Sequence, residues 1–229
     1  GLRGLSKAVR RLLRLVLPAY QPDRLHAGLP GLWRYRQALE LPPEAPVVSL
    51  GEGNTPLVEV ELPGGRTALL KCEYQNPTGS FKDRGSALLA SFLLGRGVTA
   101  AVEDSSGNAG ASFAAYAARA GIRARIYVPE AASGPKRAKI QAYGAEVVSI
   151  PGPRSNAAEA VRRAVAVEEV AYASHAYLPL NLAGYATAAY ELYEQLGGAP
   201  GTVVAPVGQG GLLLGLGRGF AALQRAGLI

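Results

Sequence analysis

The sequence predicts an α/β fold built around an open, mostly parallel sheet, and two observations lead to this prediction. From residue 67 onward, strand-like apolar runs alternate with runs of helical spacing, and the connections between them are short. Three polar or glycine-rich turns follow predicted strands, at residues 76–82, 104–112 and 206–215. Because such folds bind ligands at the carboxyl ends of their strands, these turns are the candidate binding segments.

The elements before residue 67 are a helix and an irregular arm. Residues 5–17 predict an amphipathic helix with apolar residues on one face and arginines on the other, and prolines follow it. A proline-rich passage at 39–57 then predicts an irregular arm with a short strand.

The alternating part of the chain supplies six expected strands and six expected helices. The strands are expected at residues 67–73, 99–104, 123–129, 145–150, 169–174 and 201–207. The helices are expected at residues 82–94, 107–121, 134–144, 155–167, 180–198 and 211–227. The sequence stops at Ile229, where a further strand would begin, so we expect a C-terminal part of the fold to be missing.

Composition excludes several classes of protein. With 229 residues, 48% hydrophobic and 18% charged, the chain predicts a globular protein with a sizeable core. Its apolar runs fall short of the roughly 20 residues of a membrane span, and no secretory signal pattern is present. The single cysteine, Cys72, cannot form an internal disulfide, which fits a cytoplasmic protein.

The chain is basic, with a net charge of +7, and much of the excess lies in the first 36 residues. Stacking aromatics do not interleave with the basic residues, and no nucleic-acid-binding motif is present. The charge therefore indicates general solvation or an anionic small-molecule substrate, not a nucleic acid.

The turn at 206–215, PVGQGGLLLG, follows a predicted strand and precedes an apolar helix. Glycines at such a point let backbone N–H groups converge on an anion, and the helix N-terminus adds a favourable potential. The alternative is a tight turn without a ligand. The pattern matches neither the P-loop nor a dinucleotide fingerprint.

The turn at 104–112, DSSGNAGAS, offers hydroxyls, an amide and N–H groups where a strand gives way to a helix. Ser105, Ser106 and Asn108 could bind a carboxylate or a ring hydroxyl. The alternative is that these side chains only cap the helix.

Lys82 lies at the start of a predicted helix, after Thr78 and Ser80 and before Asp83 and Arg84. A buried lysine beside a helix N-terminus and a cation has a lowered pKa, and its amine can attack a carbonyl. The alternative is a surface lysine beside an exposed Asp83–Arg84 ion pair of small value.

Together these segments resemble threonine synthases, within the fold type II enzymes that use pyridoxal 5'-phosphate. The resemblance covers residues 33–229 and is carried by GEGNTPL, KCEYQNPTGSFKDRG, SSGNAGAS and PVGQGGLLLG, in the family's order and spacing. Serine/threonine dehydratases resemble the chain less, because they tend to have histidine where it has Ala109.

The resemblance implies two open, mostly parallel sheets flanked by helices, and two domains. A large cofactor-binding domain would comprise residues 1–85 and 176–229 and lack its C-terminal part. Residues 86–175 would form a small α/β domain. A homodimer is common in the family and is expected here.

The resemblance also implies the site residues, and no metal ligand is among them. Lys82 would hold pyridoxal 5'-phosphate as a Schiff base, Phe81 would pack beside it, and Asn108 would contact its ring hydroxyl. The cofactor phosphate would be bound by Gly208, Gln209, Gly210, Gly211 and Leu212. The substrate would be bound by Ser105 and Ser106 through its carboxylate, with Thr55, Thr78 and Asn181 as further contacts.

The implied reaction converts O-phosphohomoserine and water to threonine and phosphate, and Arg84 and Arg154 are candidates for holding the phosphate. The alternatives are a serine/threonine dehydratase-like lyase, or a shortened homologue that binds without turnover. One segment departs from the family: an Asn-Pro pair and a lysine are expected where the chain has Leu178-Pro179 and Gly184 to Thr187. There Asn181 and His175 are candidate substitutes, although His175 could equally be a structural hydrogen-bonding residue.

Overall fold

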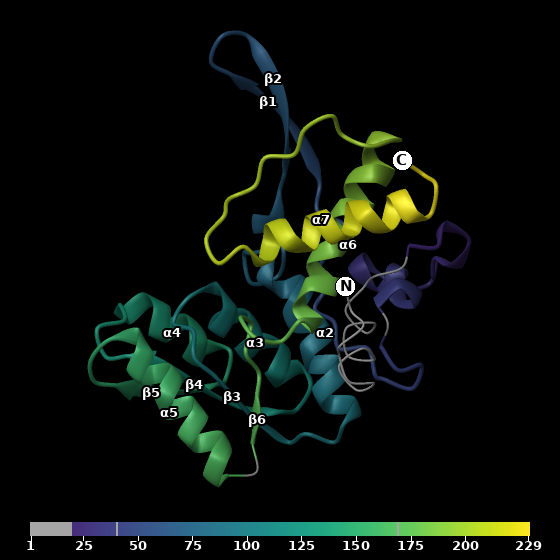
Figure 1. Ribbon diagram of the computed structural model, residues 1–229. Coiled ribbons are helices and arrows are strands. Elements are labelled where there is room, and N and C mark those ends of the chain that lie inside the picture. The colour runs from purple at the N-terminus through teal and green to yellow at the C-terminus, as the bar shows by residue number, and fades with distance from the viewer. Residues whose placement is uncertain (1–19, 40, 169) are drawn as a thin grey trace, which may run out of the picture. The chain divides into compact units, whose positions relative to one another are not determined.

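The computed structural model describes residues 20–39, 41–168 and 170–229, and the helix expected at 5–17 lies outside them (Figure 1). The chain divides into two compact units. The first unit comprises Gly1–Glu40, Gly51–Phe81 and Leu182–Ile229, and the second comprises Leu41–Leu50 and Lys82–Asn181.

The second unit is built on a four-stranded parallel sheet with the strand order β5-β4-β3-β6 (Figure 1). The strands are β3 (Ala100–Glu103), β4 (Arg123–Pro129), β5 (Glu146–Ile150) and β6 (Ala171–Tyr172), and every pairing is parallel. The parallel α/β arrangement predicted from the alternating sequence is therefore confirmed in this unit.

Helices cover both faces of this sheet. They are α2 (Lys82–Gly95), α3 (Asn108–Arg119), α4 (Gly134–Ala142) and α5 (Arg154–Val167). Successive strand residues face opposite sides, so Ala101 and Ile126 join the core formed with α2, α3 and α4, whereas Val102 and Tyr127 pack with α5. This two-sided burial explains the apolar runs Ala100–Val102 in β3 and Ile126–Val128 in β4, whereas β5, at the edge of the sheet, has exposed polar residues.

The first unit contains a hairpin and two long helices. Strands β1 (Leu57–Leu62) and β2 (Arg66–Lys71) pair antiparallel, and the helices are α6 (Leu180–Leu196), whose first two residues belong to the second unit, and α7 (Gly211–Arg225). Short 3-10 helices lie at Pro22–Arg24, Gly31–Leu39 and Glu73–Gln75.

Glycines allow α6 and α7 to approach closely. A Cβ at Gly215 would lie 2.5 Å from Tyr185 Cβ, and one at Gly219 would lie 2.6 Å from Ala189 Cβ. Any larger residue at these two positions would force the helices apart.

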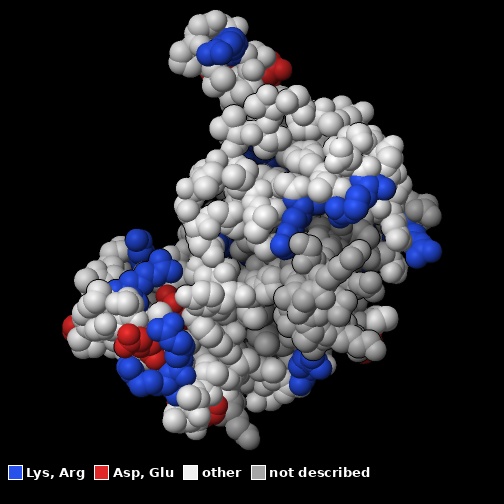
Figure 2. All heavy atoms as spheres, in the orientation of Figure 1, with Lys and Arg blue, Asp and Glu red and all other residues white. Residues whose placement is uncertain are grey.

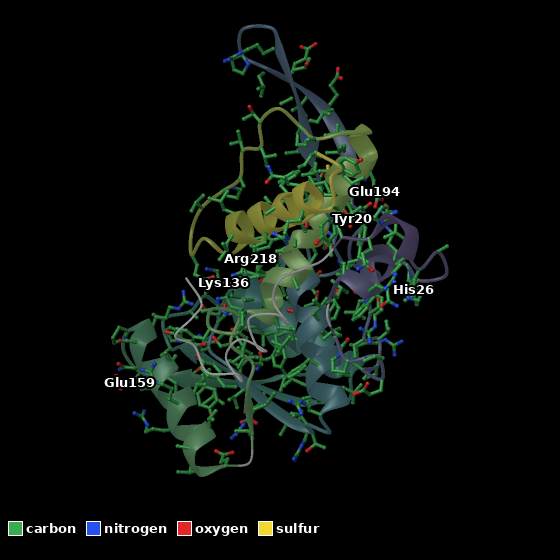
Figure 3. All side chains as sticks on the ribbon, turned by 45° about the vertical axis from the view of Figure 1, so that its right-hand side comes forward. Tyr20, His26, Lys136, Glu159, Glu194 and Arg218 are labelled. Atoms are coloured by element: carbon green, nitrogen blue, oxygen red, sulfur yellow. The ribbon has the colours of Figure 1, made fainter. Side chains whose placement is uncertain are left out.

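A tyrosine cluster forms the other part of the first unit's core. The ring of Tyr190 lies 4.8 Å from that of Tyr20 and 5.3 Å from that of Tyr35. The Tyr20 hydroxyl donates to Glu194 Oε1 at 3.1 Å, and Arg34 pairs with the same carboxylate (Figure 3).

Two details of the predicted fold are wrong. The strand expected at 201–207 is irregular, and the side chain of Val204 is 92% exposed. A strand needs a neighbouring backbone for its hydrogen bonds, and among the described residues none pairs with this segment. Likewise, in the proline-rich passage expected to contain a short strand, residues 41–56 are irregular, and only Leu57 belongs to a strand, as the first residue of β1. In the described part of the first unit, the sheet is the antiparallel hairpin of β1 and β2.

Within the described ranges, no helix is both long enough and apolar enough to cross a membrane. On the face shown in Figure 2, acidic side chains lie among the basic ones of the second unit. In this unit Arg125 and Glu168 form an ion pair, and Arg163 pairs with Glu159 at 3.7 Å along α5.

Candidate active site

Lys82 is the first residue of α2, and its surroundings lower the pKa of its amine. Burial is the largest cause, because it disfavours the charged form, and the positive charge of Arg154 acts in the same direction. The carboxylate of Glu103 opposes both. The net effect favours the neutral amine, which is the form that can act as a nucleophile or a base.

The residues after Lys82 are not a surface ion pair. Asp83 and Arg84 are both fully buried, so the alternative of an exposed Asp83–Arg84 pair is wrong. The Ser112 hydroxyl, on α3, donates to Asp83 Oδ1 at 2.6 Å and lies 2.8 Å from Ser86 Oγ. These contacts fix the first turn of α2 against α3.

The Ser105–Asn108 turn connects β3 to α3. The backbone N–H of Gly107 donates to Ser105 Oγ at 3.2 Å, and that of Ser105 donates to Glu103 Oε2 at 2.6 Å. Gly107, which has no side chain, is the N-cap residue of α3, so none of Ser105, Ser106 and Asn108 occupies the N-cap position. The Ser105 hydroxyl does accept the N–H of the N-cap residue, so its capping alternative stays open.

Gly110 allows the turn to fold back on the helix. A Cβ at this position would lie 1.9 Å from the Ser105 carbonyl oxygen and 3.1 Å from Ile126 Cγ2. Ser105 is buried, Ser106 is half-buried and Asn108 is exposed. The backbone of Ser105 is therefore fixed, and the exposure of the side chains increases from Ser105 to Asn108.

The glycine-rich turn leads into α7 in the first unit. Gly210 has φ +90°, a conformation that favours glycine, and it is the N-cap residue of the helix. A Cβ at Gly208 would meet nothing within 4 Å. The first turn of α7 contains no acidic residue, so its N–H groups and dipole favour an anion.

Phe81 packs against Tyr185, a residue that the sequence analysis did not assign to the site. Their ring centroids are 5.1 Å apart, with the planes at 72°. Tyr185 also lies beside Gly211, where a Cβ would be 3.6 Å from its ring. Within the first unit, Tyr185 therefore links Phe81 to the start of α7. The signal available in the sequence was a large residue facing glycines spaced four apart.

Thr55 and Thr78 are both buried in the first unit. The Thr55 hydroxyl donates to Glu73 Oε1 at 2.7 Å, and Lys71 Nζ donates to the Thr55 carbonyl oxygen at 2.6 Å. Lys71 also forms an ion pair with the fully buried Glu191 at 2.7 Å. These contacts, which sequence reasoning missed, hold the segment that carries Thr55.

Asn181 and His175 belong to the second unit. The Asn181 side-chain amide lies 3.4 Å from the carbonyl oxygens of Ser174 and Leu178, which are both close to it in sequence. His175 Nδ1 lies 2.5 Å from Glu103 Oε1. His175 thus has the hydrogen-bonding function that the sequence analysis left open as one of two alternatives.

The predicted site residues are divided between the two units. The second unit contains Lys82, Ser105, Ser106, Asn108 and Asn181, and Glu103 connects the first two of these by charge and by a hydrogen bond. The first unit contains Thr55, Thr78, Phe81 and the glycine-rich turn. The described residues include no group of three or more histidine, cysteine or acidic residues placed to hold a metal.

A parallel α/β unit with a lowered-pKa lysine and polar strand-end turns defines a class of ligand-binding enzyme folds. The family model described as "Pyridoxal-phosphate dependent enzyme" matches residues 48–228. The chain belongs to this family, and its fold is that of the fold type II enzymes.

Within this family, the chain is similar in sequence to several threonine synthases. The chain is 39% identical over 206 residues to a threonine synthase of Bacillus sp. (strain ULM1), covering 88% of this chain and 57% of the relative. It is 37% identical over 207 residues to a threonine synthase of Methanocaldococcus jannaschii, covering 87% and 50%. The chain spans about half the length of the curated relatives it matches.

A crystal structure of a threonine deaminase from T.th. is 37% identical in sequence, with a TM-score of 0.68 over 75% of this chain and 56% of that one. A pyridoxal 5'-phosphate-dependent aspartate racemase is 28% identical, also with a TM-score of 0.68, over 75% and 54%.

Proposed function

We propose that the chain is part of a threonine synthase, a lyase that converts O-phosphohomoserine and water to threonine and phosphate. The observation that carries the chemistry is Lys82, a partly buried amine with a lowered pKa at the start of α2. The observation that favours the substrate is the identity of 39% and 37% to threonine synthases over most of this chain.

The residues fit pyridoxal 5'-phosphate. Lys82 would carry the cofactor, the turn at 208–212 would bind its phosphate at the N-terminus of α7, and Asn108 and Phe81 would contact its ring. This fit rests on the chemistry of the donor set, namely an amine with a lowered pKa, a glycine-rich helix start without acidic residues, and an amide. When bound, the cofactor withdraws electrons from the α-carbon of an amino acid.

The protein side chains would then position the substrate and move its protons. Ser105 and Ser106 would bind the amino-acid carboxylate, with Thr55, Thr78 and Asn181 as further contacts. The Lys82 amine would remove the proton from the α-carbon. Loss of a second proton, from Cβ, would let phosphate leave from Cγ with the C–O electron pair. Cγ would then take up a proton, water would add its hydroxyl at Cβ, and Cα would be reprotonated. Arg154 already acts on Lys82 through its charge, so it is a candidate for attracting an anionic leaving group.

A serine/threonine dehydratase-like lyase is the second candidate. The likeness to the threonine deaminase, at 37% identity and a TM-score of 0.68, favours it. Ala109 argues against it, because serine/threonine dehydratases tend to have histidine at this position. Cofactor binding without turnover is the third candidate.

Three further features belong to the proposal. The large domain would comprise residues 1–85 and 176–229, and the small domain residues 86–175. A homodimer is expected, which light scattering of the purified chain would test. A cytoplasmic setting fits Cys72, which is buried and forms no disulfide.

The test begins with the position of the cofactor. The protein is incubated with pyridoxal 5'-phosphate, reduced with borohydride and digested, and the modified peptide is identified by mass spectrometry. We expect the label on Lys82 and its loss in Lys82→Ala, whereas Lys136→Ala, an exposed lysine on α4 (Figure 3), should keep it. A label elsewhere would contradict the site assignment.

The second step separates the candidate reactions. Release of phosphate from O-phosphohomoserine is compared with release of a keto acid from threonine, at equal protein concentration. Phosphate release supports the threonine synthase, and keto-acid release alone supports the dehydratase. Cofactor labelling at Lys82 without either product supports binding without turnover.

A further inference from the structure

A buried carboxylate lies at the carboxyl end of β3, beside the predicted substrate turn. The side chain of Glu103 is 0% exposed. Its Oε2 accepts the Ser105 N–H at 2.6 Å, and its Oε1 lies 2.5 Å from His175 Nδ1. Burying a carboxylate costs less when both of its oxygens accept hydrogen bonds. In Glu103 one oxygen contacts the Ser105 N–H and the other contacts the His175 imidazole.

The partners come from two neighbouring strands. His175 follows β6, which pairs with β3 through Ala101–Ala171 and Val102–Tyr172 (Figure 1). A second contact joins the same two segments, because the Tyr172 hydroxyl donates to Asp104 Oδ1 at 2.8 Å. Two side-chain contacts, Glu103–His175 and Asp104–Tyr172, therefore connect the C-terminal ends of β3 and β6.

The contact with Glu103 fixes the orientation of Ser105. Its backbone N–H is directed at Glu103, its hydroxyl oxygen accepts the Gly107 N–H, and its carbonyl oxygen lies against Gly110. Ser105 is thus held at three points, and the first of them depends on a charge. Charge-assisted hydrogen bonds are about twice as strong as neutral ones.

The same carboxylate acts on Lys82. Two influences lower the pKa of that amine, burial and the charge of Arg154, and the negative charge of Glu103 opposes them. A substitution of Glu103 should therefore change both the position of Ser105 in the turn and the pKa of the Lys82 amine.

We propose that Glu103 and His175 are a pair of positioning residues, a carboxylate and an imidazole protonated at Nδ1, that hold the Ser105–Asn108 turn in the shape that receives the substrate carboxylate. Both are positioning residues: Glu103 is fully buried and acts on the turn through Ser105, and His175 acts through its contact with Glu103. This inference rests on the proposed function, since it takes that turn as the seat of an amino acid.

The first test reads the imidazole directly and needs no cofactor. The chain has two histidines, so long-range proton–nitrogen NMR of the protein labelled with ¹⁵N-histidine gives two sets of signals, and His26 is the internal control. We expect a proton on Nδ1 of His175, and a change in its signals in Glu103→Gln while those of His26 stay unchanged. An Nδ1 without a proton, or an unchanged His175, overturns the pairing.

The second test follows the Lys82 amine. The rate of its reductive methylation is measured against pH by mass spectrometry, without cofactor. Glu103→Gln removes a negative charge that raises this pKa, so the profile should move to lower pH. His26→Gln is the matched control and should leave the profile in place. A profile that does not move in Glu103→Gln overturns the electrostatic part of the inference.

The third test separates positioning from folding. In Glu103→Gln, whose amide gives a weaker neutral contact, KM for the amino-acid substrate should rise about 10-fold, with kcat changed far less. His175→Asn, which keeps the Glu103–Ser105 bond, should raise KM in the same direction by a smaller factor. Thermal denaturation of both variants identifies any loss due to unfolding.

Unchanged KM in folded Glu103→Gln overturns the positioning role. If the wild-type chain shows no turnover at all, the proposed function fails, and the NMR and methylation results still decide whether the pair exists.

Discussion

Replacing Gly110 by alanine tests the geometry of the Ser105–Asn108 turn. The added Cβ would lie 1.9 Å from the Ser105 carbonyl oxygen and 3.1 Å from Ile126 Cγ2. The first neighbour is backbone and cannot rotate away, so the turn or the start of α3 must shift. Overpacking of this kind costs about 1–3 kcal/mol, and the better helix propensity of alanine offsets about 1 kcal/mol at most.

With the full offset the net cost lies at about 0–2 kcal/mol, and we expect Gly110→Ala to lower the free energy of unfolding by about 2 kcal/mol, because the contact is with backbone. In a chain of this size the thermal midpoint would fall by about 4–8 °C. The assay is thermal denaturation followed by circular dichroism. Gly134→Ala is the matched control, because Gly134 is the first residue of α4 and a Cβ there meets nothing within 4 Å.

The reasoning would be refuted if Gly110→Ala and Gly134→Ala had the same midpoint. That result would mean that the turn yields without cost, and that Ser105 is not held as the structure describes. A lowered midpoint together with an unchanged KM would separate stability from substrate binding.

Two further predictions concern buried charges. Glu191→Gln should lower the free energy of unfolding by about 1–3 kcal/mol in urea denaturation, because Lys71 and the Asn54 N–H lose a buried charged partner; an unchanged urea midpoint would show that this ion pair contributes nothing. Lys82→Met should be more stable than wild type at neutral pH. The folded-state pKa of Lys82 is lowered, so the unfolded chain binds more protons, and the cost of burying the lysine falls as pH rises through the interval between the lowered pKa and the ordinary one. The advantage of Lys82→Met should therefore shrink with rising pH, and an advantage that grows would contradict the direction of the shift.

The alternation of strands and helices could be predicted because helices cover both faces of the sheet in the second unit. The central strands β3 and β4 bury both faces over Ala101–Val102 and Ile126–Val128, so these stretches are continuously apolar and easy to distinguish from the helices. The segment at 201–207 has the same apolar character but forms no strand. Composition reports the tendency to be extended, and it cannot report whether a partner strand is present.

The candidate site could be predicted only in part, for a similar reason. Lys82 and Ser105 carry local signals, since each lies in a turn whose residue types are unusual. Glu103 and His175 lie 72 positions apart and meet because β3 and β6 are neighbours in the sheet. The importance of Tyr185 likewise depends on the glycines of another helix. Such pairings depend on the tertiary structure.

The burial of α2 has a consequence for how Lys82 can move. Asp83 to Ala90 are all buried, and Asp83 is anchored to α3 through Ser112. A helix packed on every side has no free face about which to rotate or slide without disrupting its neighbours. Lys82 therefore starts from a fixed point, and the travel of its amine is limited to rotations within its own four-carbon side chain. If the amine transfers protons at two atoms of the substrate, both atoms must therefore lie within reach of the Lys82 side chain.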